Sequence, residues 1–271
     1  MIPKPVRLFF RGLSLVAPPL AVPVAARLWC TPMTVPVRSD EKKIMDVAHR
    51  SECEVAGESI VCWSWGEGPT VLLLHGWGSR GSRLAAFVEP LLEAGFRVVT
   101  FDAPAHGDST GKTTTGIYYS RTIVKVADQI DDLYAIVSHS MGGWVASLAF
   151  GQGLAVDRAV FISPPDDMKY YSTIFAEQTG FSMKVQARAE RKLEIKTGVD
   201  WSQLGPEAVY GGHDFPLLVI HDRDDPISPL EHGENVNRAW KGSELMVTEG
   251  LGHRRIITDP EVISRAVGFL I

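Results

Sequence analysis

The sequence contains few cysteines, little excess charge and no apolar run long enough to cross a membrane. Its three cysteines, Cys30, Cys53 and Cys62, form no C-x-x-C pair and cannot all pair within one chain. A reducing compartment without a disulfide framework is therefore favoured. The formal net charge of −5 gives no basic surface of the kind that binds nucleic acids, so no nucleic-acid partner is expected. The apolar stretch at 12–26 is shorter than the roughly 20 residues of a spanning helix.

The first 39 residues contain no acidic residue. Their basic residues are Lys4, Arg7, Arg11, Arg27 and Arg38. The prolines in the stretch 12–26 are expected to break any helix there. The small residues at 24–26 also fit the cleavage site of a secretory signal peptide, but the prolines favour a cytoplasmic protein. We expect residues 1–49 to be an extension packed on the body, with peripheral membrane contact through basic and apolar side chains as the alternative.

Short apolar runs alternate with longer amphipathic stretches from about residue 50 onward. The apolar runs, rich in β-branched residues, predict strands at 70–76, 97–104, 134–140, 158–165, 216–222 and 244–250. Helices are expected between them, at 82–94, 118–133, 141–152, 229–240 and 260–270. Nearly continuous apolar strands that alternate with helices predict an α/β fold, with a mostly parallel open sheet flanked by helices.

The segment 166–215 interrupts this alternation. It has no strand pattern but contains aromatic and charged helical stretches, and it is too long for a loop in a compact domain. We expect a helical insertion over the sheet, whose aromatic side chains line a substrate pocket or form the insertion's own core. These aromatics are Tyr170, Tyr171, Phe175 and Phe181. The predicted organisation is an extension at 1–49, a core at 50–165 and 216–271, and a lid at 166–215.

The stretch "YAIVSHSMGGW" places Ser140 between a strand pattern and a helix pattern, with small residues two positions away on both sides. A serine in such a turn is typical of a nucleophile elbow, G-x-S-x-G, with Ser138 here in the first glycine position. The amide of Met141 would then face a reacting carbonyl oxygen at a helix N-terminus. The turn "HGWG" after the first apolar run could present the amide of Trp77 as a second donor.

A serine nucleophile needs a base and an orienting carboxylate. The run "HDRDDPISP" at 221–229 supplies aspartates after one predicted strand, and "EGLGHRRI" supplies His253 after the last. Ligands in open α/β sheets bind outside the carboxyl ends of the strands, which is where all these turns lie. The histidines beside the turns, His75 and His139, are expected to point away from the site and to brace the turns by hydrogen bonds.

Two other motifs are not supported by their spacing. The stretch "GDSTGKTTT" would be a phosphate-binding loop only with glycine at the position of His106, and no strand directly precedes it. The histidines and aspartates between 213 and 224 lack a recognised metal-ligand spacing. Neither a cofactor nor a metal is therefore expected.

Together these turns resemble the α/β-hydrolase fold over residues 54–271, apart from the insertion. "HGWG" resembles the oxyanion motif, "SHSMGG" the nucleophile elbow and "DAPAHGDS" the turn after the following strand. The resemblance implies the order nucleophile, acid, histidine, with Asp225 as the acid, His253 as the base and a lid at the insertion. Asp222, which stands in the usual glycine position of the acid motif, is the alternative carboxylate.

The resemblance implies a serine hydrolase that cleaves an ester or related acyl bond of a small molecule. Ser140 would attack, His253 would take its proton, Asp225 would orient the imidazole, and the amides of Trp77 and Met141 would form the oxyanion hole. An acyltransferase with the same residues is one alternative. A member of the fold that binds a ligand or partner without catalysis is the other.

Overall fold

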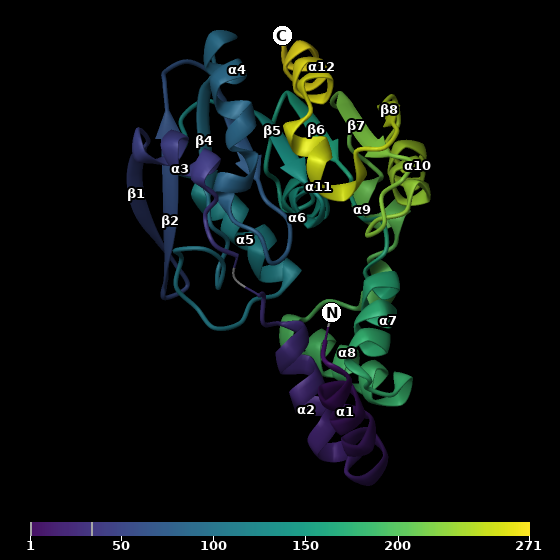
Figure 1. The fold of residues 1–271 in the computed structure, drawn as a ribbon. Coiled ribbons are helices and arrows are strands. Elements are labelled where there is room, and N and C mark those ends of the chain that lie inside the picture. The colour runs from purple at the N-terminus through teal and green to yellow at the C-terminus, as the bar shows by residue number, and fades with distance from the viewer. Residues whose placement is uncertain (1, 34) are drawn as a thin grey trace.

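The computed structural model describes residues 2–33 and 35–271. One eight-stranded sheet runs through the body in the order β1-β2-β4-β3-β5-β6-β7-β8 (Figure 1). Its strands are β1 (His49–Val55), β2 (Glu58–Trp65), β3 (Thr70–Leu74), β4 (Arg97–Phe101), β5 (Leu133–His139), β6 (Arg158–Ile162), β7 (Leu217–Asp222) and β8 (Glu244–Thr248). β1 and β2 pair antiparallel with their neighbours, and β4, β3, β5, β6, β7 and β8 pair in parallel. The mostly parallel open sheet predicted from the apolar runs is confirmed.

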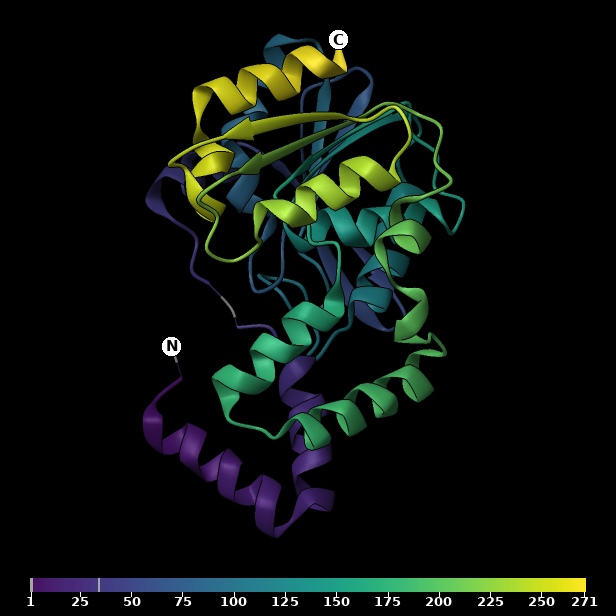
Figure 2. The same cartoon turned by 90° about the vertical axis from the view of Figure 1, so that its right-hand side faces the viewer.

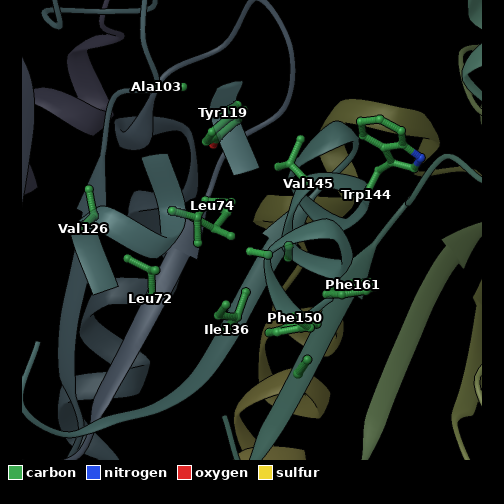
Figure 3. Close-up of a cluster of buried hydrophobic side chains, with 14 of the residues drawn as sticks. Leu72, Leu74, Ala103, Tyr119, Val126, Ile136, Trp144, Val145, Phe150 and Phe161 are labelled. Atoms are coloured by element: carbon green, nitrogen blue, oxygen red, sulfur yellow. The ribbon is translucent and has the colours of Figure 1, made fainter. Parts of the chain in front are cut away.

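Alternate residues of each central strand pack on opposite faces of the sheet. Leu72 and Leu74 of β3 lie in one buried cluster, and Val71 and Leu73 lie in the other. The first cluster is covered by α5 (Gly116–Ala127), α6 (Met141–Phe150), α9 (Pro206–Tyr210) and α10 (Leu230–Ala239). The second is covered by η1 (Gly81–Phe87), α4 (Val88–Glu93), η3 (Ile256–Thr258) and α12 (Pro260–Leu270). Figure 3 shows part of the first cluster, where α6 contributes Trp144, Val145 and Phe150. Helices on both faces explain why these strands are apolar throughout.

Four helices form a second packed layer beyond the sheet (Figures 1 and 2). They are α1 (Lys4–Val16), α2 (Pro18–Trp29), α7 (Met168–Thr179) and α8 (Met183–Thr197). We call them the four-helix layer. Its core contains small residues of α2, Ala21 and Ala25, packed against Val185 and Ala189 of α8. Segments from opposite parts of the sequence therefore share one small core.

The prediction that prolines break a helix in the stretch 12–26 is confirmed before Pro18 and wrong at Pro23, since α1 ends at Val16 and α2 begins at Pro18 but continues through Pro23. Pro18 and Pro19 occupy the first turn of α2, where the missing amide proton has no helical acceptor in any case. Pro23 lies inside α2 and removes one hydrogen bond. Packing of the alanine face of α2 on α8 keeps the helix intact despite that loss. Among the described residues, no helix is both long enough and apolar enough to cross a membrane.

The segment 166–215 lies between β6 and β7, and its helices go to two places. α7 and α8 belong to the four-helix layer, whereas α9 packs on the sheet, where Val209 and Tyr210 join the first buried cluster. The hydroxyl of Tyr210 donates a hydrogen bond to the carbonyl of Pro165, at the start of the segment. The chain therefore leaves and rejoins the sheet body at neighbouring points.

Candidate functional site

The predicted site residues come from four turns at the carboxyl ends of parallel strands. Trp77 follows β3, Ser140 follows β5, Asp225 follows β7, and His253 lies in the short helix α11 (Gly252–Arg255) after β8. Parallel strands end at the same edge of a sheet, so turns far apart in the sequence converge there. The structure brings all of them to one place.

Ser140 has a backbone conformation that few L residues adopt, with φ 54° and ψ −129°. Its amide donates to the carbonyl of Ile162 on β6 over 2.8 Å, which fixes the turn to the sheet. Two glycines give the turn room. A Cβ on Gly76 would lie 2.9 Å from the Cβ of Ser140, and one on Gly142 would lie 2.5 Å from the carbonyl oxygen of Leu74. Contacts with the surrounding backbone therefore hold Ser140 in this strained conformation.

Ser138 replaces the first glycine of the motif without disturbing the turn. Its side chain is fully buried, and the Cα of Gly143 leaves space for it. A Cβ on Gly143 would come within 3.2 Å of the Oγ of Ser138. The extra volume at position 138 is thus accommodated by a second glycine one helical position beyond Gly142.

A chain of hydrogen bonds connects Ser140, His253 and Asp225. The Oγ of Ser140 lies 3.0 Å from Nε2 of His253, and Nδ1 of His253 lies 2.7 Å from Oδ2 of Asp225. The other carboxylate oxygen of Asp225 accepts from the amides of Ile227 and Ser228. Burial opposes ionisation of Asp225, but the hydrogen bonds from His253 and these two amides outweigh it and lower the pKa of the carboxyl group. A proton on Nδ1 of His253 leaves Nε2 free to accept the serine proton.

Asp222 does not reach His253. Its two oxygens accept hydrogen bonds from the amides of Asp224, Leu251 and Gly252 and from the hydroxyl of Thr248. Burial alone would raise the pKa of Asp222, and these bonds bring it below its ordinary value. Asp222 therefore joins the turn after β7 to the turn that carries His253, and Asp225 is the carboxylate in contact with the imidazole.

The amides of Trp77 and Met141 are both free to donate. Neither has a hydrogen-bond acceptor among residues 2–33 and 35–271. Met141 is the first residue of α6, so its N–H lies at the positive end of the helix dipole. The loop of Trp77 is held in place by the next amide, since Gly78 N–H donates to Nε2 of His106 over 3.0 Å.

Three buried histidines surround these turns in the neutral form. Burial lowers the pKa of His106 to about 4 and that of His139 to about 3, and it brings the pKa of His75 well below its ordinary value. His75 accepts a hydrogen bond from Ala103 N–H and so braces its turn as predicted. The prediction that His139 points away from the site is wrong. Its ring packs 4.7 Å from the ring of His253, and its Nε2 donates to the carbonyl of His253.

A cavity of about 1440 Å³ opens from Ser140 and His253 toward the four-helix layer. Its far wall includes Phe10 of α1, Trp29 of α2 and Phe175 of α7. Of the aromatics predicted in the insertion, Tyr171 and Phe175 line the cavity, Phe181 lies in the small helical core, and Tyr170 packs on His232. Trp77 and Trp144 also line it. Sequence reasoning missed the contribution of α1 and α2, although the spacing of Val6 and Phe10 fits one face of a helix.

The described part of the chain contains no candidate metal-binding cluster. Residues 2–33 and 35–271 contain no group of three or more His, Cys, Asp or Glu side chains placed to hold a metal ion. Cys30, Cys53 and Cys62 are free and buried.

The neutral histidines predict how stability depends on pH. Nε2 of His106 accepts from Gly78, so a proton on it would break that bond. The folded chain binds this proton only near pH 4, whereas the unfolded chain binds it near the ordinary value of 6.5. The free energy of unfolding should therefore fall as the pH drops through this window, with His106 contributing about 3 kcal/mol.

Urea denaturation at several pH values measures this slope. His106→Gln, which keeps an acceptor but cannot titrate, should show a shallower loss of stability between pH 7 and pH 4. His49→Gln, at an exposed histidine, is the matched control and should follow the wild type. Equal slopes for His106→Gln and wild type would contradict this account.

Known proteins resemble this chain in sequence and in fold. The profile of the Alpha/beta hydrolase family matches residues 71–266. A Pseudomonas putida 2-hydroxy-6-oxononadienedioate/2-hydroxy-6-oxononatrienedioate hydrolase is 39% identical over 237 residues, covering 69% of this chain and 83% of that protein. The Bacillus subtilis (strain 168) protein YqkD is 24% identical over 193 residues, and the match covers 65% of this chain and 62% of that protein.

Solved structures agree on the fold. An esterase from Pyrococcus furiosus superposes with a TM-score of 0.65 at 23% identity, covering 89% of this chain and 96% of that one. The profile match covers most of the chain, and the sheet order and carboxyl-edge turns agree with it. The chain therefore belongs to the Alpha/beta hydrolase family.

Proposed function

We propose that the protein is a serine hydrolase that cleaves an ester or related acyl bond of a small molecule through an acyl-enzyme intermediate. The observation that carries this proposal is the connected set of hydrogen bonds from Ser140 through His253 to Asp225. Beside it lie two amides that have no acceptor among the described residues. Nucleophile and base within hydrogen-bond reach, and a base oriented by a third group, are the signature of covalent catalysis by serine.

The arrangement accounts for each proton and bond of the reaction. His253 Nε2 takes the Oγ proton as Ser140 attacks the carbonyl carbon, and the amides of Trp77 and Met141 hold the oxyanion that forms. Asp225 stabilises the resulting imidazolium, which then gives its proton to the leaving alcohol. Water then attacks the acyl-enzyme while His253 takes its proton. The imidazolium returns that proton to the Oγ of Ser140 as the acid leaves. Transfer of the acyl group to another alcohol would use the same residues, and analysis of the products separates the two reactions.

The lining of the cavity favours an apolar acyl group. The walls from the four-helix layer are formed by side chains such as Phe10, Phe175 and Leu193. The substrate in the name of the Pseudomonas putida relative is a dioate, which needs cationic partners for its carboxylates. Two of the three arginines on the cavity wall, Arg38 and Arg83, are already paired with Glu41. Arg254 alone has no ion pair among the described residues, so the wall offers one free cation where a dioate has two carboxylates. Trp144 offers a different polar contact, since its buried Nε1–H has no partner among the described residues.

A fluorophosphonate probe tests the nucleophile. The pre-formed oxyanion donors should direct the probe to Ser140, and mass spectrometry of the labelled protein should find the adduct there alone. Ser140→Ala should fold with unchanged thermal stability and take no label. Failure to label folded wild-type protein would support the non-catalytic binding protein instead. Continued labelling of Ser140→Ala would show that another residue is the nucleophile.

The two aspartates can be separated by substitution. Asp225→Asn should lower kcat by about 10⁴-fold, because an amide favours the wrong tautomer of His253. Asp222→Asn should cost far less activity but reduce stability by about 1–3 kcal/mol, since its carboxylate holds backbone amides of the His253 turn. Steady-state kinetics and urea denaturation measure both effects. The reverse ranking in kcat would identify Asp222 as the functional acid.

The four-helix layer should select the length of the acyl chain. Phe175 lies in the cavity wall, so Phe175→Ala should raise kcat/KM for long relative to short acyl esters by about tenfold, as expected for one or two added methylenes. Ile195→Ala is the matched control, because Ile195 lies on α8 of the same layer, is 73% exposed and does not line the cavity. It should leave the chain-length preference unchanged. A uniform loss of activity in Phe175→Ala would mean that this layer has no lid role.

A further inference from the structure

The exposed face of α1 is unusually apolar. Leu8 is 66% exposed, Phe9 63%, Leu15 75% and Val16 87%. Leu20, at the start of α2, continues this patch with 64% of its surface exposed. We call these five residues the α1 patch. Exposed apolar side chains that gather on one element mark an interaction surface more often than isolated ones do.

The apolar arc of α1 is wider than its packing in the fold requires. At 100° per residue, Phe10, Leu13 and Ser14 share one side of the helix. That side faces the four-helix layer, where Phe10 stacks on Phe181 with ring centroids 4.6 Å apart and Ser14 accepts from the amide of Ser182. The same helical spacing places the α1 residues of the patch on the opposite side, so burial in the fold accounts for only half of the arc.

Basic side chains border the α1 patch. Lys4, Arg7 and Arg11 are all exposed and lie along one flank of the apolar arc. No acidic residue occurs before Asp40. No ion pair involves these three side chains within the described part of the chain, and Arg7 donates only to the backbone carbonyl of Glu177. Three unneutralised cations therefore stand beside exposed apolar groups.

We propose that α1 docks the protein on an anionic lipid surface, with the α1 patch in the interface and the basic flank against the headgroups. A helix with an apolar face bordered by Lys and Arg binds in the plane of such an interface. Anionic headgroups supply the charge that the helix lacks. A second copy of the chain is a poorer occupant. A symmetric dimer presents the same surface twice, so the basic flanks of the two copies would repel each other.

Docking would place the cavity beside the lipid. Ile2, Pro3 and Val6 line the cavity that contains Ser140, and they lie at the start of the helix that carries the α1 patch. Val6 and Phe10 of α1 thus line the cavity, whereas the α1 patch is exposed to solvent. A lipid acyl chain would then have a short path to Ser140. This consequence depends on the proposed hydrolase function, whereas docking itself does not.

Vesicle flotation with the full chain tests the proposal. Vesicles of phosphatidylcholine mixed with phosphatidylglycerol should carry the wild type, vesicles of phosphatidylcholine alone should carry much less, and added salt should release the protein. Leu8→Glu with Leu15→Glu should abolish binding. Arg11→Glu should weaken it at least about fivefold, from about 1 kcal/mol per basic residue.

Matched variants make the result specific. Val47→Glu, at an apolar side chain that is 75% exposed and lies after α3 (Ser39–Asp46), should bind like the wild type. Ser140→Ala should also bind normally, so failure of the hydrolase proposal would leave this test intact. Circular dichroism should show all variants folded. Absence of binding to anionic vesicles, or equal binding by Leu8→Glu with Leu15→Glu, would overturn the proposal. So would a wild-type dimer that this double variant converts to monomer in gel filtration.

Discussion

The left-handed backbone of Ser140 depends on how closely three neighbouring segments approach it. The turn after β3 passes so near that Gly76 has no room for a side chain, and the first turn of α6 lies against the carbonyl of Leu74. The hydrogen bond from Ser140 N–H to Ile162 ties the turn to β6. These contacts act together to hold the strained backbone in place. They keep Ser140 at the tip of the turn, with its Oγ next to His253. The parallel sheet is therefore what positions this hydroxyl.

Few of the buried side chains at the same edge of the sheet carry a charge. Burial lowers the pKa values of His75, His106 and His139, so each imidazole stays neutral and acts through directed hydrogen bonds. The two ionised carboxylates accept hydrogen bonds from different groups and therefore have different roles. Asp222 satisfies backbone amides of the His253 turn, and Asp225 keeps one oxygen for the imidazole. A cation on His139 beside His253 would oppose formation of an imidazolium, and its low pKa prevents that.

Sequence patterns predicted the six parallel strands and the turns after them because both follow from local physical rules, but they did not predict β1 and β2. Apolar runs of strand length and the carboxyl-edge rule were sufficient to place Ser140, His253 and Trp77 in one region. The choice between Asp222 and Asp225 needed the resemblance to a family and then the backbone contacts of each carboxylate. The helices of the first 30 residues were missed because proline weighs against a helix locally. Their stability comes from α8, which lies far away in the sequence.

The sheet and the four-helix layer have separate buried cores. A substitution that reshapes the pocket therefore need not move Ser140, Asp225 or His253. Ser140, Asp225 and His253 are positioned by strands whose side chains fill the two clusters of the sheet. The far wall of the cavity belongs to helices with a separate set of fully buried residues, including Ala21, Ala25 and Val185. A change in that small core shifts the wall with little effect on the strands, because packing is transmitted mainly through direct contacts. Under the proposed function, the sheet edge determines the reaction and the four-helix layer determines which acyl group reaches it.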